Sequence, residues 1–285
     1  MRLFNESASL SFIGPGVMAE AIARNLVQAD LIDAEQIVMS GPNEIRLGDL
    51  HERHGFSTCS DNKKAVEHAA IVILCVKPQS LPVVLDELAS HIPLKSLVIS
   101  IVAGARLDSI SSRLDHKDVV RCMPNTPAQI GEGITVWMPT ASVTEDQLEL
   151  CRRILQSLGA EILVSDEDYL DMATALSGTG PAYTFLFMEA LVDAGVHLGF
   201  PRRIAEQLVI HTVKGSVAYY DYSPRHLARL RNQVTSPGGT SAEALYYLEK
   251  AGFRTALSRA IWAAYERSVQ LGEGKKRGAK DAGEA

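Results

Sequence analysis

Alternation between short apolar runs and amphipathic segments dominates the first 165 residues and limits the folds open to this chain. The apolar runs are rich in β-branched residues and nearly continuous, which is typical of strands buried on both faces of a parallel sheet. This alternation predicts a doubly wound parallel sheet with right-handed crossovers. The predicted strands are residues 10–13, 36–40, 70–76, 96–102, 118–123 and 134–138, and the predicted helices include 17–30, 43–54, 62–68 and 79–91.

A glycine-rich turn follows the first predicted strand and opens the first predicted helix. Its sequence over residues 14–19 is G-P-G-V-M-A, with the spacing G-x-G-x-x-A. Gly14 permits a tight turn, Gly16 lets the backbone approach a pyrophosphate, and Ala19 allows close packing of the helix on the strand. The helix N-terminus adds free N–H groups and a positive dipole end. In this position the motif predicts a Rossmann-like dinucleotide-binding domain, whereas taken alone it also fits a tight turn without a ligand.

The loop after the second predicted strand bears on the choice of cofactor. An NAD site usually has an acidic residue here, which accepts a hydrogen bond from the ribose 2′-hydroxyl. Residues 39–43 are M-S-G-P-N, Arg46 follows one turn later, and Glu44 is the only nearby acid. A neutral loop with an arginine accommodates a 2′-phosphate, so the sequence favours NADPH, with NADH as the alternative. Arg46 also fits a solvated charge on a helix.

Further loops follow other predicted strands and should border the same crevice, because ligands of open α/β sheets bind outside the carboxyl ends of the strands. In C-V-K-P (75–78), Lys77 fits contact with a phosphate or a carboxylate as well as it fits a lysine facing water. Two prolines make M-P-N-T-P (123–127) rigid. Within it, Asn125 either binds the nicotinamide carboxamide or caps the turn, and we expect a structural role with contact to the active site.

After residue 166 the pattern changes to helices with short interruptions. We expect an α/β domain over residues 1–165, an all-helical domain over 166–272 and a disordered tail over 273–285, which is polar, charged and rich in Gly and Ala. The predicted helices are residues 167–176, 181–198, 201–222, 224–233, 240–251 and 253–271.

Two loops of small and hydroxyl-bearing residues interrupt the helical half. S-G-T-G-P (177–181) opens one predicted helix, and T-S-P-G-G-T-S (235–241) opens another. Each combines hydroxyls, glycines and a helix N-terminus, which together favour an anion. A small carboxylate substrate fits this description, and tightly packed helix caps are the structural alternative.

Charge and composition exclude several classes of function. The formal net charge of −6 provides no basic field for nucleic acid. No apolar run reaches the ~18–20 residues that span a bilayer, and no leader pattern is present, so we expect a cytoplasmic protein without a membrane partner. Four separated cysteines and no Cys/His cluster predict no metal site. The helical half also lacks a pattern for the general base of alcohol oxidation, which hydride transfer to a protonated imine does not need.

Five motifs together resemble the Δ1-pyrroline-5-carboxylate reductase family, in its order and spacing, over residues 8–270. The resemblance implies an α/β Rossmann-like N-terminal domain followed by an all-α C-terminal dimerisation domain. It implies NAD(P)H-dependent reduction of 1-pyrroline-5-carboxylate to L-proline, the last step of proline biosynthesis. It also implies a homodimer, or a higher oligomer of dimers, whose interface completes the active site. The motifs are GPGVMAEAI (14–22), CVKP (75–78), MPNTPA (123–128), SGTGPAYTF (177–185) and VTSPGGTSAEAL (234–245).

The resemblance also implies roles for individual residues. Ser241 is implied as the catalytic residue, which orients the imine nitrogen. The implied substrate-binding residues are Glu167, Gln233, Ser236, Gly238, Gly239, Thr240 and Ser241. The implied cofactor-binding residues are Gly14, Gly16, Val17, Met18, Ser40, Gly41, Pro42, Asn62, Val76, Lys77, Pro78 and Ala103.

Two positions of this chain depart from the family pattern. The family usually has Asn or Asp three residues before S-P-G-G, where this chain has Gln233, and often a second Thr where it has Ser241. Ser241 keeps a hydroxyl, whereas Gln233 is longer by a methylene and bears on substrate positioning. The alternative functions are a reductase of another cyclic imine or of a β-hydroxy acid, and a non-catalytic nucleotide-binding paralogue. The intact glycine and S-P-G-G-T-S loops argue against the last of these.

Overall fold

The computed structural model describes residue 3, residues 9–223 and residues 225–273. The predicted tail over 273–285 therefore lies outside the described residues except for its first position. The chain forms two compact units, one of residues 1–179 with 264–285 and one of residues 180–263. The first unit thus extends past residue 165 and includes the end of the last helix.

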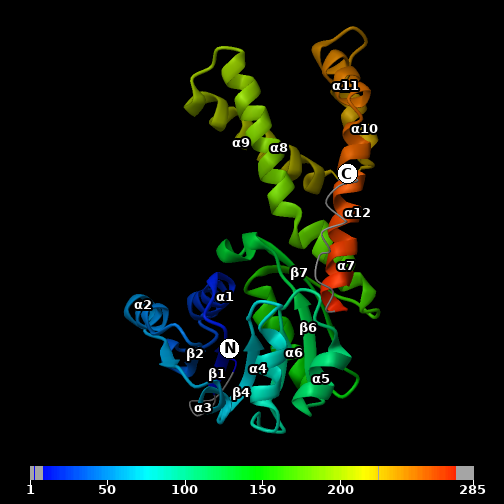
Figure 1. Ribbon diagram of the computed structural model, residues 1–285. Helices are drawn as coiled ribbons and strands as arrows, with labels where there is room; N and C mark the ends of the chain where they lie inside the picture. Colours follow the sequence, from blue (N-terminus) through cyan, green and yellow to red (C-terminus); the bar gives the residue numbers. More distant parts are fainter. Residues whose placement is uncertain (1–2, 4–8, 224, 274–285) are drawn as a thin grey trace. The chain divides into compact units, whose positions relative to one another are not determined.

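The first unit is built on an eight-stranded sheet with the order β3-β2-β1-β4-β5-β6-β7-β8 (Figure 1). All neighbouring strands are parallel except β6 and β7, which are antiparallel. Since β1 pairs with both β2 and β4, the strand order reverses there, which is where open α/β sheets bind ligands. The strands are β1 (Ser9–Ile13), β2 (Ile37–Ser40), β3 (Ser57–Cys59), β4 (Ala69–Leu74), β5 (Leu97–Ser100), β6 (Val119–Met123), β7 (Gly133–Pro139) and β8 (Gly159–Leu163).

The apolar runs of the sequence form strands because both faces of the sheet are covered. In β4, Ile71 and Ile73 belong to one core, while Val72 and Leu74 belong to the other. Successive side chains of a strand point to opposite faces, so a continuous apolar run supplies two cores at once. The predicted Rossmann-like domain is confirmed. The strands predicted over 70–76 and 96–102 each end two residues earlier in the structure, at Leu74 and Ser100.

The helices of the first unit begin and end at recognisable signals. Asn43 caps α2 by accepting a hydrogen bond from the amide of Arg46, and Gly55 ends that helix with φ 74°. Asp61 caps α3 in the same way. The α-helices are α1 (Val17–Gln28), α2 (Glu44–His54), α3 (Asn62–Val66), α4 (Leu81–Leu88), α5 (Leu107–Leu114), α6 (Glu145–Gln156) and α7 (Asp168–Ala173). Two 3₁₀ turns, η1 (Ala34–Gln36) and η2 (Thr126–Ile130), and a π-helical segment, η3 (Thr174–Gly178), complete the unit.

The second unit consists of helices in its described residues and has a small core of its own. Val192, Ala205 and Val209 are its buried cluster, whereas many large apolar side chains are exposed, among them Phe185 at 60% and Trp262 at 62%. Its helices are α8 (Gly180–His197), α9 (Arg202–Tyr222), α10 (Leu227–Gln233), α11 (Thr240–Lys250) and α12 (Phe253–Gly272), which continues into the first unit. Across the described residues, none of the helices is both long and apolar enough to cross a membrane.

Candidate active site

The glycine loop after β1 is fixed by its neighbours on both sides. Gly14 has φ 100°, and its amide donates to the carbonyl of Ser40 at 2.9 Å. A Cβ on Gly14 would lie 2.9 Å from the carbonyl carbon and oxygen of Cys75. Both the backbone angle and the space therefore require glycine at this position.

Gly16 serves a different purpose in the same loop. It is the N-cap of α1 and makes no side-chain cap, and a Cβ placed on it would meet nothing within 4 Å. The first N–H groups of α1 are therefore open to an anion, which the helix dipole also favours. Val17, which follows, is 63% exposed.

The loop after β2 lies directly against the glycine loop. A Cβ on Gly41 would be 2.5 Å from Cδ of Pro15, so only glycine allows this approach. The hydroxyl of buried Ser40 donates to Oδ1 of Asn62 at 2.8 Å, and Asn62 Nδ2 donates to Glu87 at 3.0 Å. The structure thus brings together predicted cofactor residues from the loops after β1, β2 and β3.

Arg46 is not a solvated helix charge. Its Nε donates to the carbonyl of Pro15 at 3.0 Å, Nη1 donates to Asp49 at 2.8 Å, and Nη2 contacts Glu20 at 2.5 Å. Burial alone would raise the pKa of Glu20, but hydrogen bonds from Arg46, His54 and Arg53 lower it to about 2. The arginine is therefore already paired with two carboxylates.

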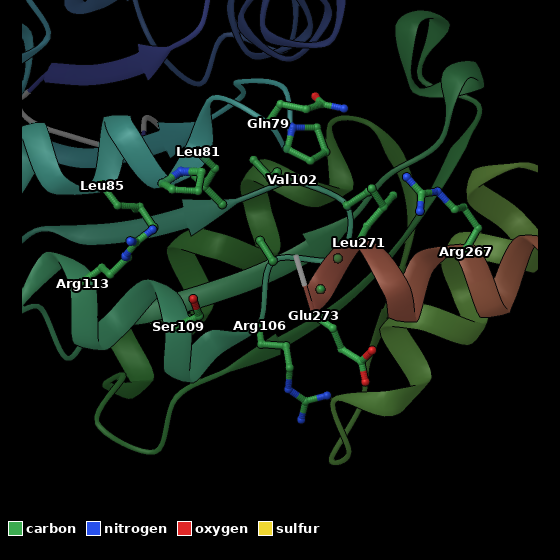
Figure 2. Close-up of a pocket in the computed structure, with 16 residues that line it drawn as sticks. Gln79, Leu81, Leu85, Val102, Arg106, Ser109, Arg113, Arg267, Leu271 and Glu273 are labelled. Carbon is green, nitrogen blue, oxygen red and sulfur yellow. The ribbon is translucent and has the colours of Figure 1, made fainter. Parts of the chain in front are cut away.

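The predicted nicotinamide residues lie after β4 and β5. Pro78 and Ala103 line the same cavity of about 550 Å³, beside Val102 and the last turn of α12 (Figure 2). Lys77 is exposed, and Val76 is half-buried. Gly104 has φ 73°, and a Cβ on it would lie 2.8 Å from the amide of Gly272, so α12 forms part of this wall.

Asn125 has the structural role expected of it. Its Oδ1 accepts a hydrogen bond from the amide of Ile134 at 3.0 Å, which closes the turn before β7. The following 3₁₀ turn is held from α1, where Arg24 donates to the carbonyl of Gln129 and Asn25 donates to that of Ala128 at 2.7 Å.

Glu167, implied to bind the substrate, makes internal bonds and is only 8% exposed. Its Oε1 accepts from Nη1 of Arg121 at 2.9 Å and from the amide of Leu107 at 2.8 Å. It belongs to the first unit, whereas the loop 236–241 belongs to the second. Arg121 was not among the predicted site residues, although it is the one charged residue within the apolar strand β6.

The S-P-G-G loop forms a tight turn that starts α11. The amide of Gly239 donates to the carbonyl of Ser236 at 3.0 Å, and Gly238 has φ 70°. Proline at the second position and a glycine of positive φ at the third are typical of a type II turn. Gly239 is the N-cap of α11 and supplies no side-chain cap. The turn therefore opens the helix N-terminus beside hydroxyl-bearing residues, with Ser241 half-buried in the first turn.

The S-G-T-G loop begins inside the π-helical segment η3 and ends at the start of α8. The amide of Thr179 donates to the carbonyl of Thr174 at 2.8 Å, five residues back. A Cβ on Gly178 would lie 2.7 Å from Cε of Met123, at the carboxyl end of β6. π-helical turns of this kind are frequent at functional sites.

Two family models match the chain. One, described as pyrroline-5-carboxylate reductase dimerisation, matches residues 167–271, and the other, described as NADP oxidoreductase coenzyme F420-dependent, matches residues 9–104. A dinucleotide-binding sheet followed by this dimerisation domain defines an NAD(P)H-dependent oxidoreductase.

The similarity to known proteins covers nearly the whole chain. This chain is 39% identical to the pyrroline-5-carboxylate reductase of Synechocystis sp. over 94% of this chain and 99% of that protein. It is 35% identical to the pyrroline-5-carboxylate reductase of Arabidopsis thaliana over 94% of this chain and 97% of that protein. The structure of the Plasmodium falciparum enzyme with NADP bound is 32% identical over 94% of this chain and 100% of that one, with a TM-score of 0.87. This chain belongs to the pyrroline-5-carboxylate reductase family, as its motifs indicate.

Proposed function

We propose that this protein reduces 1-pyrroline-5-carboxylate to L-proline with a nicotinamide dinucleotide, NADPH by preference and NADH as the alternative. The observation that carries the proposal is the glycine loop at the reversal of strand order, where Gly14 and Gly41 bring three loops into contact. The NADP bound in the Plasmodium falciparum relative supports the choice of cofactor.

The residues present fit such a cofactor. The uncapped N-terminus of α1 after Gly16 has room for a pyrophosphate, and no Cβ obstructs it. Val17, Met18, Ser40, Pro42 and Asn62 would surround the adenosine and its ribose. Val76, Lys77, Pro78 and Ala103 would hold the nicotinamide. When bound, the dinucleotide supplies the hydride for reduction of the imine carbon.

The substrate loop would bind the carboxylate of the imino acid. The open amides of α11 and the hydroxyls of Ser236, Thr240 and Ser241 supply donors, and Gly238 and Gly239 allow close approach. Ser241 orients the imine nitrogen but is a poor proton source, so catalysis depends on alignment and exclusion of water. Gln233, exposed at the end of α10, would influence how the ring is seated.

Glu167 would act indirectly, by positioning other residues of the site. Its bond to the amide of Leu107 holds the start of α5, which follows directly on the loop containing Ala103. We therefore assign Glu167 to positioning the loop that contains Ala103, which would contact the nicotinamide. The substrate contact implied by the family resemblance is the competing role.

A homodimer is part of the proposal. The match to the dimerisation family and the exposed apolar side chains of the second unit favour a second copy as the partner, since the buried cluster among the unit's described residues is small. Sedimentation of the purified protein should give twice the chain mass or an even multiple. A monomer at micromolar concentration would contradict this part.

The activity test follows oxidation of NADPH by absorbance in the presence of 1-pyrroline-5-carboxylate. We expect turnover with this imine, slower turnover with NADH, and much slower turnover with a six-membered cyclic imine. Preference for the larger ring would identify a reductase of another imine. Binding of NADPH without turnover of either imine would identify a non-catalytic paralogue.

A further inference from the structure

A cluster of charged side chains lies beside the glycine loop, formed by Glu20, Arg46, Asp49, Arg53 and His54 and called here the Glu20 cluster. Glu20 contacts Arg46 at 2.5 Å, Arg53 at 2.8 Å and His54 at 2.9 Å. Asp49 pairs with Arg46 at 2.8 Å and with Arg53 at 2.6 Å. The two carboxylates therefore balance the charges of the two guanidinium groups.

One bond distinguishes Arg46 from Arg53 within this cluster. Nε of Arg46 donates to the carbonyl of Pro15, the residue between the two loop glycines. The ring of Pro15 lies against Gly41, so this carbonyl belongs to the contact between the loops after β1 and β2. Arg46 thereby fixes the backbone of the glycine loop from outside.

We propose that Arg46 positions the glycine loop for either dinucleotide, and that Glu20 neutralises Arg46 and so limits selection of the 2′-phosphate. This inference rests on the proposed function. To bind a phosphate, the guanidinium would have to give up charge-assisted hydrogen bonds to carboxylates, which are among the strongest in proteins. It would also bring a dianion close to the carboxylate of Glu20. The Glu20–Arg46 pair therefore weakens selection for the 2′-phosphate and does not create it.

The first test compares Arg46→Met with Arg53→Met, a matched control that loses the same carboxylate partners but not the bond to Pro15. Each full-length variant is titrated with NADPH and with NADH, without substrate. We expect Arg46→Met to lower the affinities for NADPH and NADH by a similar factor of about ten. Arg53→Met should change either affinity by less than about threefold. Loss of NADPH affinity exceeding that of NADH by tenfold would overturn the proposal. So would a lower melting temperature with unchanged affinities, because a merely structural residue would behave in that way.

The second test is Glu20→Gln, which keeps the side-chain size but removes one of the two counter-charges of the arginines and leaves that of Asp49. We expect the ratio of NADPH to NADH affinity to rise about fivefold at low salt and by less at high salt, because salt partly screens the attraction between a partly exposed arginine and a phosphate. An unchanged ratio would overturn the neutralising role of Glu20. Failure of the wild-type protein to bind either dinucleotide would instead contradict the proposed function itself.

Discussion

Nη2 of Arg121 lies 2.9 Å from Oδ1 of Asp171, and both side chains are almost completely buried. The hydroxyl of Ser268 donates to the same oxygen at 2.7 Å, and Nη1 of Arg121 pairs with Glu167 at 2.9 Å. Strand β6, helix α7 and the end of α12 are therefore joined by one buried network. The guanidinium of Arg121 is shared between two carboxylates, and Glu167 also lies 3.4 Å from the partly exposed Arg106, so Asp171 depends on Arg121 more than Glu167 does.

Arg121→Met should destabilise the first unit strongly. Removing one partner of a buried ion pair leaves uncompensated charge, which typically costs about 3–5 kcal/mol. The matched control is Arg113→Met, because Arg113 forms an exposed pair with Asp86 at 3.5 Å and such pairs contribute less than about 1 kcal/mol. Unfolding in denaturant measures both variants, and equal losses of stability would contradict this account.

Stability should depend on the ionised form of Glu20 at acid pH. The pKa of Glu20 is lowered from 4.5 to about 2 in the folded protein, so its contribution is complete above pH 4.5 and is lost as pH falls towards 2. We expect Glu20→Gln to lower the free energy of unfolding by about 2–3 kcal/mol at pH 7 and by much less near pH 3. The exposed Glu145→Gln variant serves as control. A Glu20→Gln effect that does not change with pH would show that the charge is not responsible.

Gly14→Ala and Gly16→Ala should separate folding from cofactor binding. Alanine at position 14 meets Cys75 and has an unfavourable φ, so we expect a loss of about 1–3 kcal/mol in stability together with weaker NADPH binding. Alanine at position 16 meets no atom of the chain and has φ −78°, so only NADPH binding should weaken. Melting temperatures without cofactor and NADPH titrations provide the comparison. Unchanged NADPH affinity in Gly16→Ala would argue against the pyrophosphate site.

Gly239→Val should damage the substrate loop alone. A Cβ at this position would lie 2.5 Å from Oγ and 3.2 Å from the carbonyl oxygen of Ser236, so the hydroxyl has to rotate away and the branched valine crowds the turn. We expect binding of a proline analogue to weaken at least about tenfold while the dissociation constant for NADPH stays the same. Calorimetry with each ligand in turn measures both effects. Unaltered binding of the analogue would remove the loop from the proposed site.

Ser241→Ala should lower kcat/KM for 1-pyrroline-5-carboxylate by about ten- to a hundredfold, because one hydrogen bond that orients the imine is lost. Ser241→Thr restores a hydroxyl and should recover most of the activity. Steady-state rates at saturating NADPH supply the measurement. Activity of Ser241→Ala equal to that of the wild type would exclude Ser241 from the orienting role.

The strands and the glycine turn of this protein could be predicted from the sequence alone, because they depend on local chemistry. The six predicted strands are present because their apolar runs are long enough to supply two cores, and Gly14 could be identified because its tight turn tolerates only glycine. The strands that were overlooked are β3, which has three residues, and β8, which is largely exposed at one edge of the sheet. Neither contains a buried run that a pattern of hydrophobicity can detect.

Only the tertiary structure decided which partners the charged residues have. Arg46 looked free to bind a phosphate, yet it pairs with Glu20, 26 positions away. Glu167 looked available to the substrate, yet it pairs with Arg121, 46 positions away. Spacing along a chain reports turns and helix faces, because these depend on neighbouring residues. The partner of a charge depends on which strands and helices the fold places side by side, and that is settled only when the sheet and its covering helices have packed.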